Sequence, residues 1–137
     1  MKKYYCLILL SVAIAISCGS DNSIIGSLDH AAQIMNEKPD SAKIVLDGIR
    51  RSELKSRALK ARFALLYSQA MDKCYIDTDN DSLISVALKY YSKHGTDHEK
   101  ALAYYYESVV HCNAKNIESQ IKAMLVAQKY IEKTDDE

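Results

Sequence analysis

Apolar residues recur at intervals of three and four along most of the chain, the spacing that places them on one face of an α-helix. Short polar or helix-breaking segments interrupt this pattern and divide it into pairs of helices. Because the connection within each pair is brief, its two helices should lie antiparallel. The pattern therefore predicts an all-α domain over residues 24–134, built from three stacked hairpins at about 24–50, 52–95 and 97–133.

The first hairpin contains two short helices joined around Pro39. A proline disfavours helical backbone in the residue before it, so the first helix should end there, and Asp40 or Ser41 can cap the second. Helical spacing predicts the buried face of each helix. The expected positions are Ile25, Leu28, Ala32 and Met35 in the first helix, and Ala42, Val45, Leu46 and Ile49 in the second.

The second hairpin should begin near Ser52 and its first helix should end at about Lys73 or Tyr75. Asn80 or Asp81 is then in position to cap the next helix, which ends at Gly95. In the third hairpin the first helix starts near Asp97. Its expected apolar face is Ala101, Tyr104, Tyr105, Ser108 and Val109, and that of the last helix is Ile121, Met124, Leu125, Ala127 and Ile131.

The first twenty residues have the pattern of an export signal. Lys2 and Lys3 precede an apolar run over residues 4–16, which is too short for the ~20 residues that span a bilayer. The segment from Ala15 to Cys18 resembles a bacterial lipobox, which implies removal of residues 1–17, lipidation of Cys18 and a flexible tether over residues 18–23. An ordinary signal peptide cut near Cys18 and an uncut anchor remain the alternatives.

Composition supports a small helical domain and excludes some partners. The chain has four Gly, one Pro and no Trp, which favours helices over a turn-rich sheet. Removal of residues 1–17 takes away only Lys2 and Lys3 among the charged residues, which leaves two more acidic than basic side chains. This charge balance creates no positive electrostatic potential that would attract nucleic acid, so we expect no nucleic-acid partner.

Two cysteines, Cys74 and Cys112, remain in the predicted helical domain. Cysteines in a helical domain usually act as small buried apolar residues. An oxidising compartment would also permit a disulfide, but pairing requires α-carbons within about 7 Å, which the sequence does not establish. Burial is the expectation, and the disulfide remains the alternative.

The third hairpin resembles a tetratricopeptide-type repeat, a helix-turn-helix unit of about 34 residues. The residues that match are Tyr104 to Val110, the loop from Asn113 to Ile117, and Ala127. In the second hairpin Ala64, Tyr67 and Ala87 occupy the corresponding small and aromatic positions. The segment from Leu65 to Lys73, followed by an acidic loop, also resembles the N-terminal part of longer exported bacterial repeat lipoproteins, which implies either a short member of that group or a chain truncated at its C-terminus.

This resemblance implies a short solenoid with a protein-binding groove. In such repeats the first helix of each unit lines the concave surface. The positions that would point into the groove are Leu65, Ser68, Gln69, Tyr105, Val109 and Asn113. None of them is Lys or Arg, which argues against a clamp for the terminal carboxylate of a peptide.

No catalytic, metal or cofactor site is expected. Asp77, Asp79 and Asp81 match the first, third and fifth ligands of a calcium-binding EF-hand loop, but Ser82 and Leu88 occupy the required Gly and Glu positions. Gly95 lies between His94 and His98 and breaks the helix that would align them. The chain also lacks a phosphate-binding loop, a nucleophile elbow and an activated cysteine motif, so we expect no enzyme.

The sequence predicts a lipoprotein that is anchored at the cell envelope, in the outer membrane or at the cell surface rather than in the inner membrane. Its helical scaffold would bind a protein or peptide partner. The final helix exposes enough apolar surface to predict self-association through that end. The alternative function is the exported sensor part of a longer signalling or transcription-regulating protein. Binding of glycans is disfavoured by the absence of Trp.

Overall fold

The structure is a computed structural model that describes residues 22–134. Within these residues every regular element is helical and no strand occurs, which confirms the all-α class. No helix in this part of the chain is long and apolar enough to cross a membrane. The predicted signal peptide, Cys18 and the start of the tether lie outside the described residues, as do Asp135 to Glu137.

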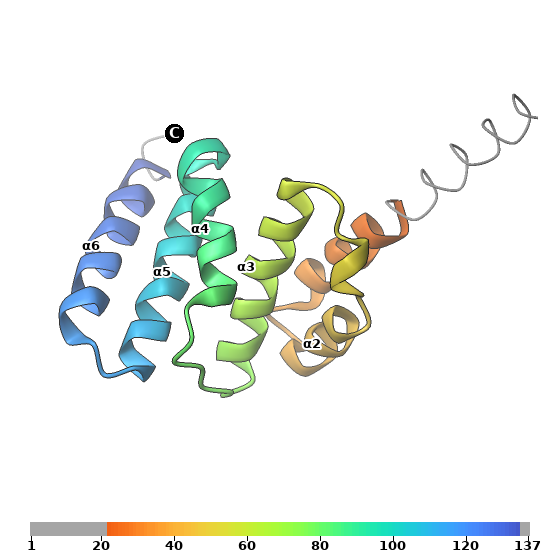
Figure 1. The fold of residues 1–137 in the computed structure, drawn as a ribbon, viewed down its shortest axis with the longest axis horizontal. Coiled ribbons are helices and arrows are strands. Elements are labelled where there is room, and N and C mark those ends of the chain that lie inside the picture. The colour runs from red at the N-terminus through yellow and green to blue at the C-terminus, as the bar shows by residue number, and fades with distance from the viewer. Residues whose placement is uncertain (1–21, 135–137) are drawn as a thin grey trace, which may run out of the picture.

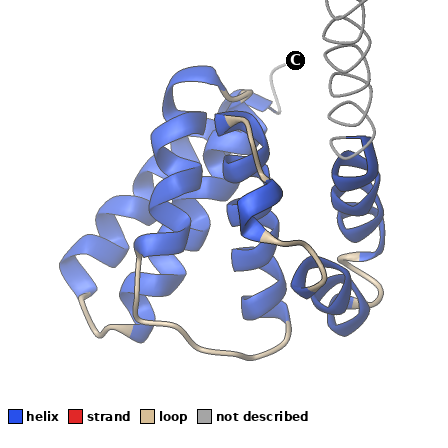
Figure 2. Cartoon of the chain, turned by 45° about the vertical axis from the view of Figure 1, so that its right-hand side comes forward, coloured by secondary structure: helices blue, strands red, loops and turns tan. Residues whose placement is uncertain are grey.

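A helix over residues 22–34 precedes the labelled elements. These are α2 (Pro39–Asp47), the 3-10 turn η1 (Arg51–Glu53), α3 (Arg57–Lys73), α4 (Ser82–His94), α5 (Asp97–Asn113) and α6 (Ile117–Thr134). Helices α3 to α6 lie side by side in chain order, and each runs opposite to the one before it (Figure 1). Loops join them at their ends, and the longest of these connects α3 to α4 (Figure 2).

The first helix begins earlier than predicted and buries a different face. Residues 22 and 23 are already helical, so the predicted tether over residues 18–23 is wrong at its end. The buried stripe is Ile24, Leu28, Ala31 and Met35, whereas Ile25 is 39% exposed. Both stripes fit helical spacing, and the packing of α3 selects the one that includes Ile24 and Ala31.

Two predicted helix starts also need correction. Pro39 is itself the first residue of α2, with Lys38 at the N-cap, so Asp40 lies inside the first turn. Helix α3 begins at Arg57 rather than near Ser52, because the Ser56 hydroxyl accepts a hydrogen bond from the Leu59 amide at 3.1 Å and caps the helix there. The preceding residues instead form η1 and a connection anchored by buried Leu54.

Helices α3 and α5 end in the same way. After α3, the amides of Tyr75 and Ile76 donate to the carbonyls of Asp72 and Met71, which is the Schellman arrangement. Lys115 and the next residue repeat these bonds after α5. Tyr75 and Lys115 adopt φ angles of 56° and 57°, the left-handed conformation that this motif requires. Both turns are therefore built without glycine.

The N-cap residue of α4 is Asp81, one of the two predicted candidates, and it forms no side-chain capping bond. At its start the Asn80 side-chain oxygen accepts a hydrogen bond from the Ser82 amide at 2.8 Å. Gly95 occupies the C-cap position as predicted, but its φ of −81° is not left-handed. Glycine is needed there for space, because an added Cβ would lie 2.9 Å from both the ring and the carbonyl oxygen of Tyr91. Helix α5 follows directly, with a capping box between Thr96 and Glu99.

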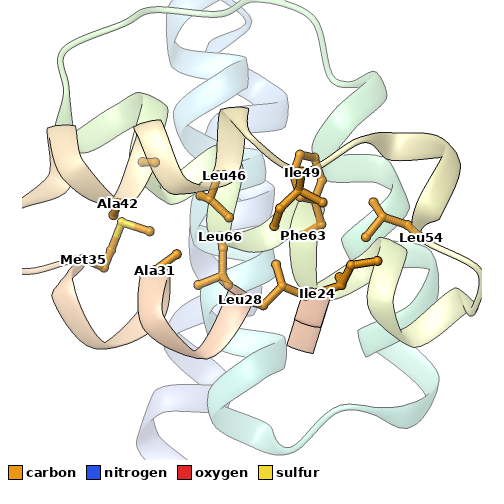
Figure 3. Close-up of a cluster of buried hydrophobic side chains, with 11 residues drawn as sticks. Ile24, Leu28, Ala31, Met35, Ala42, Leu46, Ile49, Leu54, Phe63 and Leu66 are labelled. Carbon is orange, nitrogen blue, oxygen red and sulfur yellow. The ribbon is translucent and has the colours of Figure 1, made fainter. Parts of the chain in front are cut away.

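Helix α3 contributes to two hydrophobic cores from opposite faces. The first core joins it to the N-terminal helices and is drawn in Figure 3. Its buried members are Ile24, Leu28, Ala31, Met35, Ala42, Leu46, Ile49, Leu54, Phe63, Leu66 and Ala70. The second core joins α3 to α4 and α5, with Ala61, Ala64, Leu65, Ile84, Ala87, Tyr91, Ala103, Tyr106 and Val110 buried.

The buried face of α5 differs from the predicted one. Tyr106 and Val110 enter the second core, whereas Tyr105 is 39% exposed and Val109 is half-buried. Successive residues on a helix are rotated by about 100°. A predicted stripe that is displaced by one residue therefore exchanges neighbouring tyrosines between the core and the surface. Ala101 and Ser108 are buried as expected.

Candidate partner-binding surfaces

The six residues predicted to line a groove lie at different depths. Leu65 and Ser68 are buried, with 6% and 8% exposure, and Leu65 belongs to the second core. Gln69, Val109 and Asn113 are half-buried, and Tyr105 is exposed. The structure therefore leaves only part of this set accessible to a partner.

Three of these residues, Ser68, Val109 and Asn113, meet around one small cavity between α3 and α5. Its volume of about 20 Å³ is close to that of a single water site, not of a ligand. The Asn113 side-chain amide donates to the Thr78 carbonyl at 3.2 Å, which ties the end of α5 to the loop after α3. This part of the predicted groove has a clear structural role.

The acidic loop between α3 and α4 is held by its own side chains. The Asn80 side-chain oxygen accepts from the Ser82 amide just before α4, and the Thr78 hydroxyl accepts from the Asn80 amide at 3.4 Å. Asp77, Asp79 and Asp81 are exposed. Within residues 22–134 no group of three His, Cys, Asp or Glu side chains is placed to hold a metal ion.

Both cysteines of the described region are free thiols. Cys74 is half-buried after α3, and burial, followed by a hydrogen bond with Asp40, raises the pKa of its thiol. Cys112 is exposed on α5, contrary to the expected burial. The stripe that packs α5 passes through Ser108 and Val110 instead, so Cys112 faces outward.

A larger hollow lies between the beginning of α3 and the end of α4. We call it the basic groove, and its volume is about 380 Å³. Its walls come from single faces of the two helices, at helical spacing on each. It is lined by Arg57, Lys60, Val86, Lys89, Tyr90, Lys93 and His94.

The basic groove has an unbalanced charge. Its lining includes no Asp or Glu, and none of its basic side chains forms an ion pair within residues 22–134. Lys89 and Lys93 are four residues apart on α4, a like-charge spacing that costs about 0.2–0.5 kcal/mol. Arg57 lies in the first turn of α3, where the helix dipole is positive and an acidic residue would be favoured.

The dipole explains only part of this cluster. Lys93 and His94 occupy the last turn of α4, where cations stabilise a helix. The same argument does not apply to Arg57 or Lys60, because these residues lie near the N-terminus of α3, which is the positive end of its dipole. At the α3 wall of the groove, the basic residues therefore reduce helix stability and concentrate positive charge.

An apolar extension continues the groove along α3 and α4. A second hollow of about 220 Å³ shares Lys60 and Val86 with the first and adds Arg51. Its further lining residues are Leu54, Phe63, Ala64, Ser82 and Leu83, and again none is acidic. The Arg51 guanidinium lies 5.8 Å from the centre of the Phe63 ring, at the edge of this hollow.

The outer side of α6 is a second accessible surface. Helix α6 packs extensively against α5 alone among the described elements, with Ala123 and Ala127 buried in the contact. We call its exposed apolar side the α6 face. It comprises Ile117, Ile121, Met124, Leu125 and Ile131, which are 66%, 53%, 39%, 60% and 43% exposed. These side chains lie on one side of the helix, and exposed apolar residues grouped in this way make the α6 face a candidate contact surface.

The sequence identified the α6 face but not the basic groove. The signal for the groove was present in the spacing of the basic residues, Arg57 with Lys60 at i, i+3 and Lys89 with Lys93 at i, i+4. What the sequence did not contain was the pairing of these two faces, which depends on how α4 packs against α3.

Comparisons with protein-family models, curated proteins and solved structures found no match to this chain.

Proposed function

We propose that this protein is a lipid-anchored helical scaffold that binds a protein partner at the cell envelope. The observation that carries the proposal is the α6 face, because five large apolar side chains on one helix are left in contact with solvent. The expected occupant is a helix of a partner protein, packed on α6 as α6 is packed on α5. In purified protein a second copy of the chain would take its place.

The similar construction of the two large hairpins supports a tetratricopeptide-like solenoid. Helices α3 and α5 each contain 17 residues, each begins at a Ser or Thr whose hydroxyl accepts a backbone hydrogen bond, and each ends in a Schellman turn. In solenoids each unit contacts its neighbours and leaves an open end. Among the described residues, the α6 face is in the position of such an end.

The anchor is proposed from the sequence. The apolar run over residues 4–16 and the lipobox-like residues that end at Cys18 support export followed by lipidation. Several acyl chains hold a protein stably on a membrane, whereas a single chain does not. A scaffold that is fixed in this way would meet its partner at a membrane surface, in the outer membrane or at the cell surface.

Photo-crosslinking in cells tests the partner-binding role. A photoreactive residue at Leu125, 60% exposed on the α6 face, should crosslink to a discrete protein. The matched control is the same group at Tyr75, which is 94% exposed in the loop after α3. Equal crosslinking patterns at the two positions, or none at Leu125, would contradict the proposal.

The anchor is tested separately with Cys18→Ala. Labelling with a clickable palmitate should be lost in this variant, and the protein should move from the membrane to the soluble fraction. Labelling that persists in the variant would show that Cys18 is not the lipidated residue.

A further inference from the structure

We propose that the basic groove and its apolar extension bind an acidic peptide segment that carries apolar side chains. This inference rests on the proposed scaffold role and names the chemistry of a second contact, away from the α6 face. The six basic side chains Arg51, Arg57, Lys60, Lys89, Lys93 and His94 line the two hollows without an acidic neighbour in the lining. Carboxylates of a partner would supply the missing charge.

The size and composition of the site fit a peptide. Helix α4, which forms one wall, has 13 residues and is therefore about 20 Å long, a span that about six residues of extended chain cover. The basic end would receive carboxylates, and the apolar extension would receive aliphatic side chains beside Leu83 and Val86. Tyr90 adds a phenol between the basic residues of α4.

A membrane surface fits this site less well. Proteins that lie on anionic membranes present protruding apolar side chains together with their basic residues. Here the deepest apolar residues are recessed, since Leu54 and Phe63 are only 4% and 3% exposed and line a hollow, and Val86, 40% exposed, is the exception. A narrow chain reaches such residues, and a broad bilayer does not.

Fluorescence polarisation with the full-length chain in detergent provides the test. The probe is a fluorescein-labelled peptide of about ten residues in which Glu alternates with Leu, and the reference peptide carries Lys in place of Glu. The groove variant is Lys60→Glu with Lys93→Glu. The charge-matched control is Lys38→Glu with Lys115→Glu, two exposed lysines outside both hollows.

Wild type and the control variant should bind the Glu probe with equal affinity and bind it at least tenfold more tightly than the Lys peptide. The groove variant should lose at least tenfold in affinity and retain its helical circular dichroism. Should that variant unfold, Lys60→Gln with Lys93→Gln gives the same comparison with less repulsion.

Several results would overturn the inference. These are no binding of the Glu probe by wild type, equal binding of the two peptides, or unchanged binding in a folded groove variant. Wild type that ignores the peptide but sediments with phosphatidylglycerol vesicles through Lys60 and Lys93 would reassign the groove to a membrane surface. Leu125→Glu separates the two proposals, since it should abolish the α6 contact and leave peptide binding intact.

Discussion

The rings of Tyr104 on α5 and Tyr130 on α6 are stacked, with centroids 6.0 Å apart and planes inclined by 14°. The ammonium groups of Lys100 and Lys133 lie 5.3 and 5.2 Å from the centre of the Tyr130 ring. Since α6 has no second helix among the described residues to cover its outer side, this aromatic contact and the buried alanines beside it hold α6 in place.

Tyr130→Ala should loosen α6 while the rest of the domain stays folded. Aromatic pairs contribute about 0.5–1.5 kcal/mol beyond the area they bury, so amide exchange in α6 should become several-fold to about tenfold faster. Exchange in α3 should not change. Tyr75→Ala, at a residue that is 94% exposed, is the control. Equal protection of α6 in both variants would show that the stacked rings do not stabilise it.

Gly95→Ala should destabilise the protein although its backbone conformation is open to any residue. The new methyl group would lie 2.9 Å from the ring and from the carbonyl of Tyr91, and overpacking of this kind costs about 1–3 kcal/mol. Gly26→Ala is the counterpart, because nothing lies within 4 Å of its added Cβ in the first helix. It should raise stability by about 0.5–1 kcal/mol.

Thermal melts would distinguish these two glycine variants. The melting temperature should fall for Gly95→Ala and rise for Gly26→Ala, by several degrees per kcal/mol in a domain of this size. A stable Gly95→Ala protein would mean that the start of α5 moves to make room.

The contacts of Asp47 with Lys43 and Tyr67 should make stability depend on pH in acid. The Tyr67 hydroxyl donates to Asp47 Oδ1 at 2.7 Å and joins α3 to α2. The Lys43 ammonium first, and then this hydroxyl, hold the pKa of Asp47 below its ordinary value. A lowered pKa means that the contribution is present above the unfolded value of about 3.9 and is lost as pH falls through the folded pKa.

Urea unfolding of wild type and Asp47→Asn, followed from neutral pH down to about pH 2, measures this contribution. Wild type should be more stable at neutral pH, and the difference should shrink below about pH 4. Tyr67→Phe should give a smaller difference at neutral pH, since the Lys43 contact remains. A difference between wild type and Asp47→Asn that is constant over the whole range would exclude this linkage.

The sequence predicted what depends on local patterns and failed where packing chooses between similar patterns. Helical periodicity was sufficient for the helical class and for an end of α3 at about Lys73 or Tyr75, where the structure has Lys73, and the glycine itself indicated the C-cap at Gly95. Periodicity did not show which of Tyr105 and Tyr106 is buried, because the two residues are of the same type and adjacent on the helix. Only the contact of α5 with α3 and α4 buries Tyr106.

The basic groove shows the same limit for a candidate site. Each of its lysines, considered alone, is an ordinary solvated side chain. The groove exists because Lys60 on α3 and Lys89 on α4 line one hollow, and that pairing follows from the second core, which fixes how α4 lies on α3. The exposed stripe of α6 needed no such information, since a single helix carries it.

Light scattering on the chain from residue 19 to Glu137 tests the central claim, that the α6 face is a protein-contact surface. At tens of micromolar, wild type should form dimers or larger species, and Leu125→Glu should be monomeric with its helices intact. Lys38→Glu, on an exposed side chain outside the face, should behave as wild type. A wild-type protein that is a monodisperse monomer at this concentration and melts in one sharp transition would contradict the account.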